Sequence, residues 1–276
     1  MKKSILITGC SSGIGLDAAR GMRERGWRVF AGCRQQRDCD RMRAEGFESP
    51  RIDYTDPASI KAGLDQVLEA TGGTLDALFN NGAHGLPGAV EDLPTEGLRA
   101  IFEANFFGWH ELTRLVLPVM RRQGHGRIVQ NSSVLGLVAF PWRGAYVATK
   151  YAIEGLTDTL RVELTDTDIH VILIEPGPVT SKIREKSIPH FERFIDWKNS
   201  ALKDLYERSL LKRLYEDSGK DAFELPPSAV TAKLAQACES RRPRPRYYVT
   251  TPTYISGFLR RVLPTRASDR ILARLR

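Results

Sequence analysis

A tyrosine and a lysine that stand four residues apart, Tyr146 and Lys150, form the pair in this sequence whose side chains could exchange protons. Residues four apart on a helix share a face, with Cβ atoms about 5–6 Å from each other, so the Lys150 ammonium would lie beside the Tyr146 phenol. A nearby cation favours the phenolate and lowers a pKa that is ordinarily about 10. Because a proton donor works best with a pKa near the operating pH, the spacing predicts a general acid–base site. The alternative is a tyrosine and a lysine on the surface of an ordinary amphipathic helix.

A glycine-rich segment near the amino terminus favours the acid–base interpretation. Residues 8–15 read Thr-Gly-Cys-Ser-Ser-Gly-Ile-Gly, between an apolar run and residues with helical spacing, which is the order strand, tight turn, helix. Gly9 can take a positive φ, Gly13 lets the backbone approach a pyrophosphate, and Gly15 lets the helix pack close to the strand. The helix N-terminus then faces the anion. The segment therefore predicts a dinucleotide cradle, with contacts from Gly9, Ser11, Ser12, Gly13, Ile14 and Gly15.

Together these motifs resemble those of the short-chain dehydrogenase/reductase family, over about residues 1–240. Within the family the chain is most similar to hydroxysteroid and retinol dehydrogenases and their bacterial aldehyde-reductase relatives. The resemblance implies four catalytic residues, Ser133, Tyr146, Lys150 and Asn105. It also implies cofactor contacts from Asp53, Asn81, Gly82, Tyr146, Lys150, Pro176, Gly177, Val179 and Thr180. The chain departs from the family at Gly82-Ala83, where Ala-Gly is usual, and we expect this exchange to alter the loop without abolishing binding.

The resemblance also implies a role for each catalytic side chain. Hydride would pass between the nicotinamide and a carbonyl carbon while Tyr146 gives the oxygen its proton. Lys150 would bind the nicotinamide ribose and stabilise the phenolate, and Ser133 would hydrogen-bond the substrate oxygen. Asn105 would hold a water that relays protons from Lys150. Without the family, Asn105 is better interpreted as a helix-interior asparagine tied to a backbone group.

Alternating strand and helix patterns predict the scaffold that would position these residues. Length and composition, 276 residues with 42% hydrophobic, suit one α/β domain with a doubly wound parallel sheet of the Rossmann type. We expect strands near residues 4–9, 27–32, 50–53, 76–81, 126–132, 169–175 and 246–249. Helical patterns from about 95 to 122 and from about 144 to 164 carry Asn105 and the Tyr146–Lys150 pair. Sites in such sheets form at the carboxyl ends of strands, which is where the predicted residues converge.

The residues after the second strand bear on the choice of cofactor. An acidic residue about 20 positions past the glycines normally binds the ribose hydroxyls of NAD, but here the stretch reads Ala-Gly-Cys-Arg-Gln at 31–35. Arg34 is placed to pair with the 2′-phosphate of NADP, assisted by Ser12 and Arg37, so we expect NADP(H). The alternative is that Arg34 is a solvated surface residue and that Asp38 or Asp40 binds the ribose.

A segment at about 181–226, which the resemblance identifies as a substrate lid, is rich in large apolar residues. These are Ile183, Phe191, Phe194, Ile195, Trp197, Leu205, Tyr206, Leu210, Leu211, Leu214 and Tyr215. They favour a small-molecule substrate, either an apolar carbonyl compound or an alcohol, with a bulky body such as that of a retinoid, a steroid or a long-chain aldehyde. The alternative is that they only pack the lid onto the sheet. Phe140 and Trp142 are expected in the pocket wall, and His84 is left outside the catalytic set.

Four cysteines, Cys10, Cys33, Cys39 and Cys238, show neither metal-ligand spacing nor a disulfide framework. Reduced thiols favour a cytoplasmic location, and no metal site is predicted. No apolar run approaches the roughly 18 residues of a membrane span.

The basic character of the chain lies in residues 241–276, which contain ten arginines, no lysine and one acid. This extension is +9, and the remainder is −1 because the whole chain is +8. Apolar residues recur in it at helical spacing, so one hypothesis is a peripheral contact with the inner face of a membrane. The alternative is a tail that folds over the substrate cleft or a partner subunit.

Other classes of function stay open. An NAD-dependent alcohol dehydrogenase is the nearest, and a non-catalytic cofactor-sensing protein is another. No nucleic-acid partner is expected, because the sequence has no recognisable reading element such as a helix-turn-helix. The resemblance implies a homodimer or a homotetramer.

Overall fold

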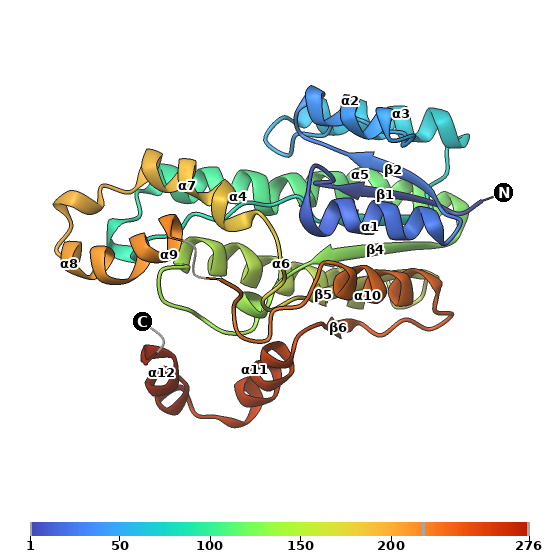
Figure 1. Cartoon of the computed structure of the whole chain (residues 1–276). Helices are drawn as coiled ribbons and strands as arrows, with labels where there is room; N and C mark the ends of the chain where they lie inside the picture. Colours follow the sequence, from blue (N-terminus) through green and yellow to red (C-terminus); the bar gives the residue numbers. More distant parts are fainter. Residues whose placement is uncertain (1, 217–218, 275–276) are drawn as a thin grey trace.

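The computed structural model describes residues 2–216 and 219–274, and its centre is a parallel sheet (Figure 1). The strand order is β2-β1-β3-β4-β5-β6, and every pairing is parallel. The strands are β1 (Ser4–Thr8), β2 (Arg28–Gly32), β3 (Ala77–Asn80), β4 (Gly126–Asn131), β5 (Ile169–Glu175) and β6 (Arg246–Tyr248). The predicted α/β class with a doubly wound sheet is confirmed.

Apolar residues on both faces of the strands explain why helices cover the sheet twice. In β1, Ile5 and Ile7 face one cluster of buried side chains while Leu6 faces the other, because successive strand residues point to opposite faces. The first cluster includes residues of α1 (Gly13–Glu24), α2 (Gln36–Ala44) and α10 (Ser228–Glu239). The second includes residues of α3 (Pro57–Thr71), α5 (Gly108–Gln123) and α6 (Gly144–Glu163). Burial on both faces is the arrangement that parallel sheets require.

The predicted strand at 50–53 was wrong. This segment runs beside β2 but makes only the isolated bridges Phe30–Glu48 and Cys33–Arg51. Pro50 has no N–H to donate to a ladder. The chain then turns at once, because the Asp53 carboxylate accepts from Thr55 N at 3.1 Å and Asp56 caps α3.

The predicted helix from 95 to 122 is divided by a π turn. α4 (Thr95–Phe102) continues through the π turn Glu103–Phe107 into α5. The wider turn lies where Asn105 points inward and is fully buried. Single π turns of this kind often mark functional positions in helices.

The predicted lid is a set of short helices around a third apolar cluster, beyond α4 and α6 (Figure 1). It comprises α7 (Ile183–Phe194), the 3₁₀ turn Trp197–Asn199, α8 (Lys203–Leu205), the π turn Tyr206–Leu210 and α9 (Leu211–Tyr215). Phe191, Ile195, Tyr206, Leu210 and Leu214 are all buried. Packing therefore accounts for these five lid residues.

The basic extension begins by completing the sheet, because its first residues form β6. α11 (Thr251–Val262) follows and lies next to β6, and α12 (Thr265–Ala273) lies beyond α11, farther from the sheet (Figure 1). α11 packs against the 3₁₀ turn Val134–Gly136, where Arg260 donates to Gly136 O at 3.3 Å. Within the part of the chain that the structure describes, no helix is both long and apolar enough to cross a bilayer.

Candidate active site

The carboxyl ends of β1, β3, β4 and β5 bring most of the predicted site residues together at one edge of the sheet. At the end of β1, Gly9 has φ +70°, and a Cβ there would lie 2.6 Å from Gly82 Cα. Gly13 has φ +56°, at the first residue of α1. A backbone this close, at the N-terminus of a helix, fits a dinucleotide pyrophosphate.

The loop after β3 is tied to this turn by hydrogen bonds. Asn81 Nδ2 donates to Thr8 O at 2.9 Å, and the N–H groups of Asn81 and Gly82 reach Thr8 Oγ1 at 2.9 and 3.2 Å. Asn131, at the end of β4, donates to Asn81 Oδ1 at 2.8 Å. The three strand ends are thereby held as one unit.

The departure from the family at Gly82-Ala83 has a packing reason. A Cβ on Gly82 would lie 3.3 Å from the Tyr54 ring and 3.4 Å from Gly9 Cα, which is tight. Ala83 instead packs against the second apolar cluster. The small residue at position 82 thus allows the two loops to touch.

Helix α6 positions Tyr146 and Lys150 one turn apart, as the spacing predicted. Lys150 Nζ lies 5.4 Å from the centre of the Tyr146 ring and 4.4 Å from that of Trp109. It also donates to Asn131 O at 2.7 Å. Burial lowers the pKa of Lys150 to about 7, while the nearby Glu154 carboxylate opposes that shift.

The electrostatics of Tyr146 differ from the sequence-based expectation. Burial raises the pKa of the Tyr146 phenol above its ordinary value, and the opposing influences are the Ser133 hydroxyl and the Arg143 cation. Lys150 lies one turn along the same helix, with its Nζ near the Tyr146 ring. The lowering of the Tyr146 pKa by Lys150 stays a prediction.

Arg143 is a residue that the sequence-based reasoning missed. It immediately precedes α6, and Trp142 before it adopts a left-handed φ of +66°, which is unusual for a residue with a side chain. Burial lowers the pKa of Arg143 to about 10, with the charges of Arg213 and Arg184 adding to the shift. Its position three residues before Tyr146, a cation one turn away, is the signal that could have found it.

Ser133 and Asn105 are both buried at this edge. Ser133 Oγ accepts from Leu135 N at 3.1 Å, and the Ser133 hydroxyl also hydrogen-bonds to the Tyr146 phenol. Asn105 Oδ1 accepts from His84 N at 3.1 Å, and Asn105 Nδ2 donates to His84 O at 2.8 Å. Asn105 is thus tied to a backbone, as the alternative interpretation expected, but to a loop distant in sequence. Its role in holding a water stays a prediction.

His84 links this loop to the lid. Its ring stacks on that of His190 in α7, with centroids 3.8 Å apart and an interplanar angle of 13°. Burial, and then the His190 charge, lower the pKa of His84 to about 3, so the ring is neutral at physiological pH. The contact is one of several that seat α7 on the cradle.

The loop after β5 carries the remaining predicted cofactor contacts. Pro176 O accepts from Val134 N at 2.7 Å, next to Ser133. Gly177 lies against Thr250, where a Cβ would overlap the hydroxyl. Val179 forms a bridge with Leu225, and Thr180 N donates to Leu225 O at 3.0 Å, so the end of the lid borders this loop.

The residues that were predicted to bind the adenosine half of the cofactor lie farther apart than the residues around Tyr146. Arg34 is exposed at the end of β2, and within residues 2–216 and 219–274 its guanidinium has no hydrogen bond or ion pair. Asp53 holds the turn before α3 through Thr55. The alternative ribose ligands both have partners on α2, since Asp38 lies 3.4 Å from Arg41 and Asp40 lies 2.9 Å from Arg43.

All four cysteines are buried and free. Cys10 lies inside the glycine turn, and its thiol donates to Ile7 O at 3.2 Å. Burial raises the pKa of Cys10 well above its usual range and raises those of Cys33 and Cys238 to about 12.

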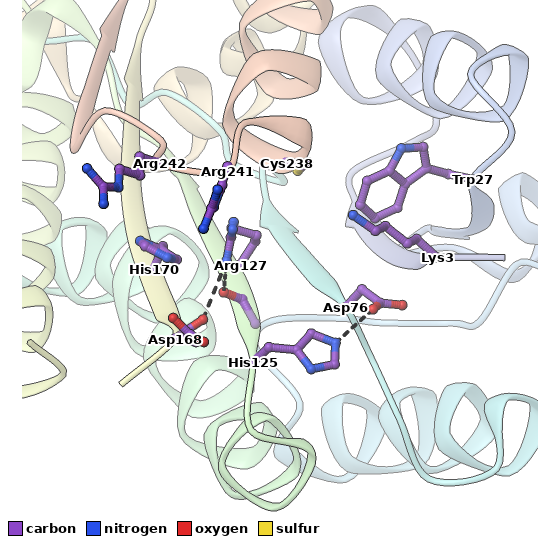
Figure 2. A pocket seen from close by; sticks show the side chains of 11 residues that line it. Lys3, Trp27, Asp76, His125, Arg127, Asp168, His170, Cys238, Arg241 and Arg242 are labelled. Atoms are coloured by element: carbon purple, nitrogen blue, oxygen red, sulfur yellow. Dashed lines mark hydrogen bonds and ion pairs between the residues drawn. The ribbon is translucent and has the colours of Figure 1, made fainter. Parts of the chain in front are cut away.

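A hollow of about 530 Å³ lies at the opposite edge of the sheet, where the strands begin. Figure 2 shows the cationic side chains that line it, Lys3, Arg127, Arg241 and Arg242, together with the Trp27 ring. It contains none of the predicted site residues. The glycine turn, Ser133 and Tyr146 therefore define the candidate active site, at the carboxyl edge.

Comparison with known proteins agrees with this site. A model of the short chain dehydrogenase family matches residues 3–191. "Uncharacterized oxidoreductase YbbO" of Escherichia coli K12 is 42% identical over 273 residues, which cover 99% of this chain and 94% of the relative. Human 17-beta-hydroxysteroid dehydrogenase type 1 is 30% identical over 260 residues, which cover 89% and 77%.

A solved structure gives the same result for the fold. The short chain dehydrogenase/reductase of Burkholderia phymatum, in complex with NAD, matches with a TM-score of 0.78 at 27% identity. The match covers 99% of this chain and 95% of that chain. The family match, the near full-length relative and the shared fold have one consequence: the chain is an oxidoreductase that belongs to the short chain dehydrogenase family.

Proposed function

We propose that the protein is an NADP-dependent reductase of carbonyl compounds with a bulky apolar body, such as long-chain aldehydes, retinoids or steroid-like ketones. The observation that carries the proposal is the convergence of Tyr146, Ser133 and Lys150 beside a glycine cradle whose adenosine side ends in Arg34. NADPH oxidation with an aldehyde, followed by absorbance, tests the activity directly. The absence of turnover with every carbonyl compound tested would contradict it.

Each side chain has a chemical task that follows from its contacts. A nicotinamide cofactor held in the cradle would supply the hydride. Tyr146 donates its proton to the substrate oxygen, and the neighbouring Ser133 hydroxyl donates to the same oxygen as negative charge develops there. Lys150 spends one donor on Asn131 O, which leaves its other hydrogens for a ribose hydroxyl. Arg143 offsets part of the desolvation that disfavours the Tyr146 phenolate.

The preference for NADP is proposed from Arg34. Its guanidinium is exposed and has no partner among the described residues, and a guanidinium pairs well with a phosphate. We expect Arg34→Asp to lower kcat/KM with NADPH by about 10–100-fold and to raise it with NADH, because a carboxylate repels the 2′-phosphate and accepts from ribose hydroxyls.

Steady-state kinetics with both cofactors would measure this change. Arg122→Gln, an exposed arginine at the end of α5, is the control and should leave both values unchanged. If the ratio of kcat/KM with NADPH to kcat/KM with NADH is the same in Arg34→Asp as in the unaltered chain, Arg34 does not determine the cofactor preference.

The apolar substrate class is proposed from residues that border the cleft. Trp142, Ile188, Phe194 and Trp197 are only partly buried against the lid cluster, as is Tyr146 itself. A hollow of about 330 Å³ lies beside Trp142, lined also by the apolar residues Ala89, Val90, Pro141 and Leu202 and by one acid, Glu91. We expect kcat/KM to rise along a series of straight-chain aldehydes, by up to about fourfold for each methylene that becomes buried. A flat profile from butanal to decanal would argue against an apolar pocket.

An NAD-dependent alcohol dehydrogenase is the second candidate. The observation that favours it is Asp38, a partly buried carboxylate near the end of β2. Under this alternative, NADH would support turnover better than NADPH, and alcohols would be oxidised readily.

The basic extension is proposed to touch an anionic membrane surface. α11 exposes Tyr254, Ile255, Phe258 and Val262, next to the exposed basic residue Arg261. We also propose that the protein works in a reducing compartment such as the cytoplasm, since its four thiols are free. A homodimer or a homotetramer is the proposed assembly.

Sedimentation with lipid vesicles would test this surface. We expect the full chain to pellet with vesicles that contain phosphatidylserine, and Phe258→Ser to reduce pelleting several-fold, because both apolar burial and charge contribute. Phe107→Ser, an exposed phenylalanine outside the extension, is the matched control. Equal pelleting of the Phe258 variant and the unaltered chain would remove the membrane proposal.

A further inference from the structure

A lysine of the lid contacts the cofactor cradle directly. Lys186, in α7, donates to Ser12 Oγ at 2.8 Å and to Ser11 Oγ at 3.2 Å. Both serines belong to the glycine-rich turn and lie just before α1. The contact therefore joins two segments that are about 175 residues apart in the sequence.

The Lys186 ammonium lies at an exposed position where, among the described residues, no hydrogen-bond partner carries a charge. Its hydrogen-bond partners are neutral hydroxyls, and it lies at the N-terminus of α1, where the helix dipole is positive. Arg34 and Lys182 add further positive charge nearby, and Asp38 and Glu185 supply part of a balance. Burial and these cations lower the pKa of Lys186. The Lys186 ammonium, the Arg34 guanidinium, a helix N-terminus and two hydroxyls are the kinds of group that bind a phosphate.

Other contacts seat the same helix on both sides of the crevice. Ser181, just before α7, lies within van der Waals reach of a Cβ built on Gly13, at 3.4 Å. Ser187 lies so close to Gly85 that a Cβ there would be 2.6 Å from its hydroxyl. His190 stacks on His84 one turn further along. A ligand that binds Lys186 would therefore also stabilise the packing of α7 on the cradle.

We propose that Lys186 is a phosphate-binding residue contributed by the lid, and that a phosphate of the bound dinucleotide draws α7 onto the cradle through it. The phosphate accepts from Lys186 and Arg34, neither of which forms an ion pair within residues 2–216 and 219–274, and cofactor binding and lid closure become one event. This inference rests on the proposed function, because it requires a dinucleotide in the cradle. Either the 2′-phosphate or the pyrophosphate has the required chemistry.

Two variants of Lys186 and one neighbour test the proposal. Lys186→Met removes the charge and keeps the length, Lys186→Arg restores a cation, and Lys182→Met removes a nearby exposed cation that pairs with Glu185. The dissociation constants of NADPH and NADH would be measured for each by quenching of tryptophan fluorescence. Hydrogen exchange of residues 183–194 would be measured with and without NADPH.

We expect Lys186→Met to weaken the binding of NADPH about 10–100-fold, since a charge-assisted hydrogen bond to phosphate is lost. The same variant should abolish the protection of α7 from hydrogen exchange that NADPH gives. Lys186→Arg should recover most of both effects, and Lys182→Met should resemble the unaltered chain. If only NADPH binding is weakened, the contact is assigned to the 2′-phosphate. If NADH binding is weakened equally, the contact is assigned to the pyrophosphate.

Two results separate this inference from the proposed function. If the unaltered chain binds and oxidises NADPH but Lys186→Met has the same affinity or the same protection of α7, the inference is overturned and the proposed function stands. If the unaltered chain binds neither dinucleotide, the proposed function itself fails.

Discussion

Tyr146→Phe is expected to lower kcat by about 10²–10⁴-fold, because the general acid is removed while the ring that packs against the lid cluster is kept. The phenol hydroxyl is the proposed proton donor to the carbonyl oxygen, and it lies beside Ser133 and within reach of the Arg143 charge. Cofactor affinity should change by no more than about twofold, since only one hydroxyl is lost from a large interface. Stopped-flow measurement of NADPH oxidation, with the dissociation constant measured separately, distinguishes the two effects.

The same helix offers a matched control for that experiment. Tyr151 is five residues further along α6, is partly exposed and donates to Leu137 O at 2.8 Å. Tyr151→Phe removes an identical atom and should keep turnover close to that of the unaltered chain. Equal rates for the Tyr146 and Tyr151 variants would show that the assigned proton donor is wrong.

Lys150→Met is expected to have opposite effects on activity and stability. Activity should fall by at least about 100-fold, because the donors to Asn131 and to the ribose are lost. The free energy of unfolding should rise by about 1–3 kcal/mol at pH 6, since a fully buried ammonium is replaced by an apolar side chain. Part of the gain is lost because Asn131 O is left without its donor.

The dependence of that gain on pH follows from the pKa of Lys150. Folding lowers this pKa from 10.5 to about 7, so between these values the unfolded chain binds the proton more strongly than the folded chain. The cost of the buried charge is therefore complete below about pH 7 and fades as the pH rises toward 10.5. Thermal unfolding of the variant and the unaltered chain at pH 6 and pH 9.5 should show the larger difference at pH 6. Lys61→Met, an exposed lysine, should show no such trend.

Local patterns in the sequence predicted the sheet and the glycine turn well, for a physical reason. A buried parallel strand requires an apolar run, and the turn requires glycine where φ is positive, so each leaves a mark in a few adjacent residues. The same holds for Tyr146 and Lys150, whose relation is set by one turn of helix. The strand predicted at 50–53 was wrong because Pro50 and the turn that follows it prevent this segment from forming a regular ladder with β2.

Contacts between distant segments were beyond local reasoning. Lys186 meets the glycine turn, and Asn105 meets the His84 backbone, only after the lid and the π turn are in place. The lid residues were ambiguous because burial in a packed cluster and exposure to a substrate both require large apolar side chains. The electrostatics of Tyr146 depended on burial, which spacing alone does not supply.

The burial of the four thiols bears on how the protein would withstand reactive compounds. Electrophiles such as unsaturated aldehydes alkylate cysteine through the thiolate, and here burial suppresses ionisation of Cys10, Cys33 and Cys238. Cys39 has no exposed surface at all. If the protein reduces aldehydes as proposed, thiols that resist ionisation protect it from alkylation by reactive members of that class.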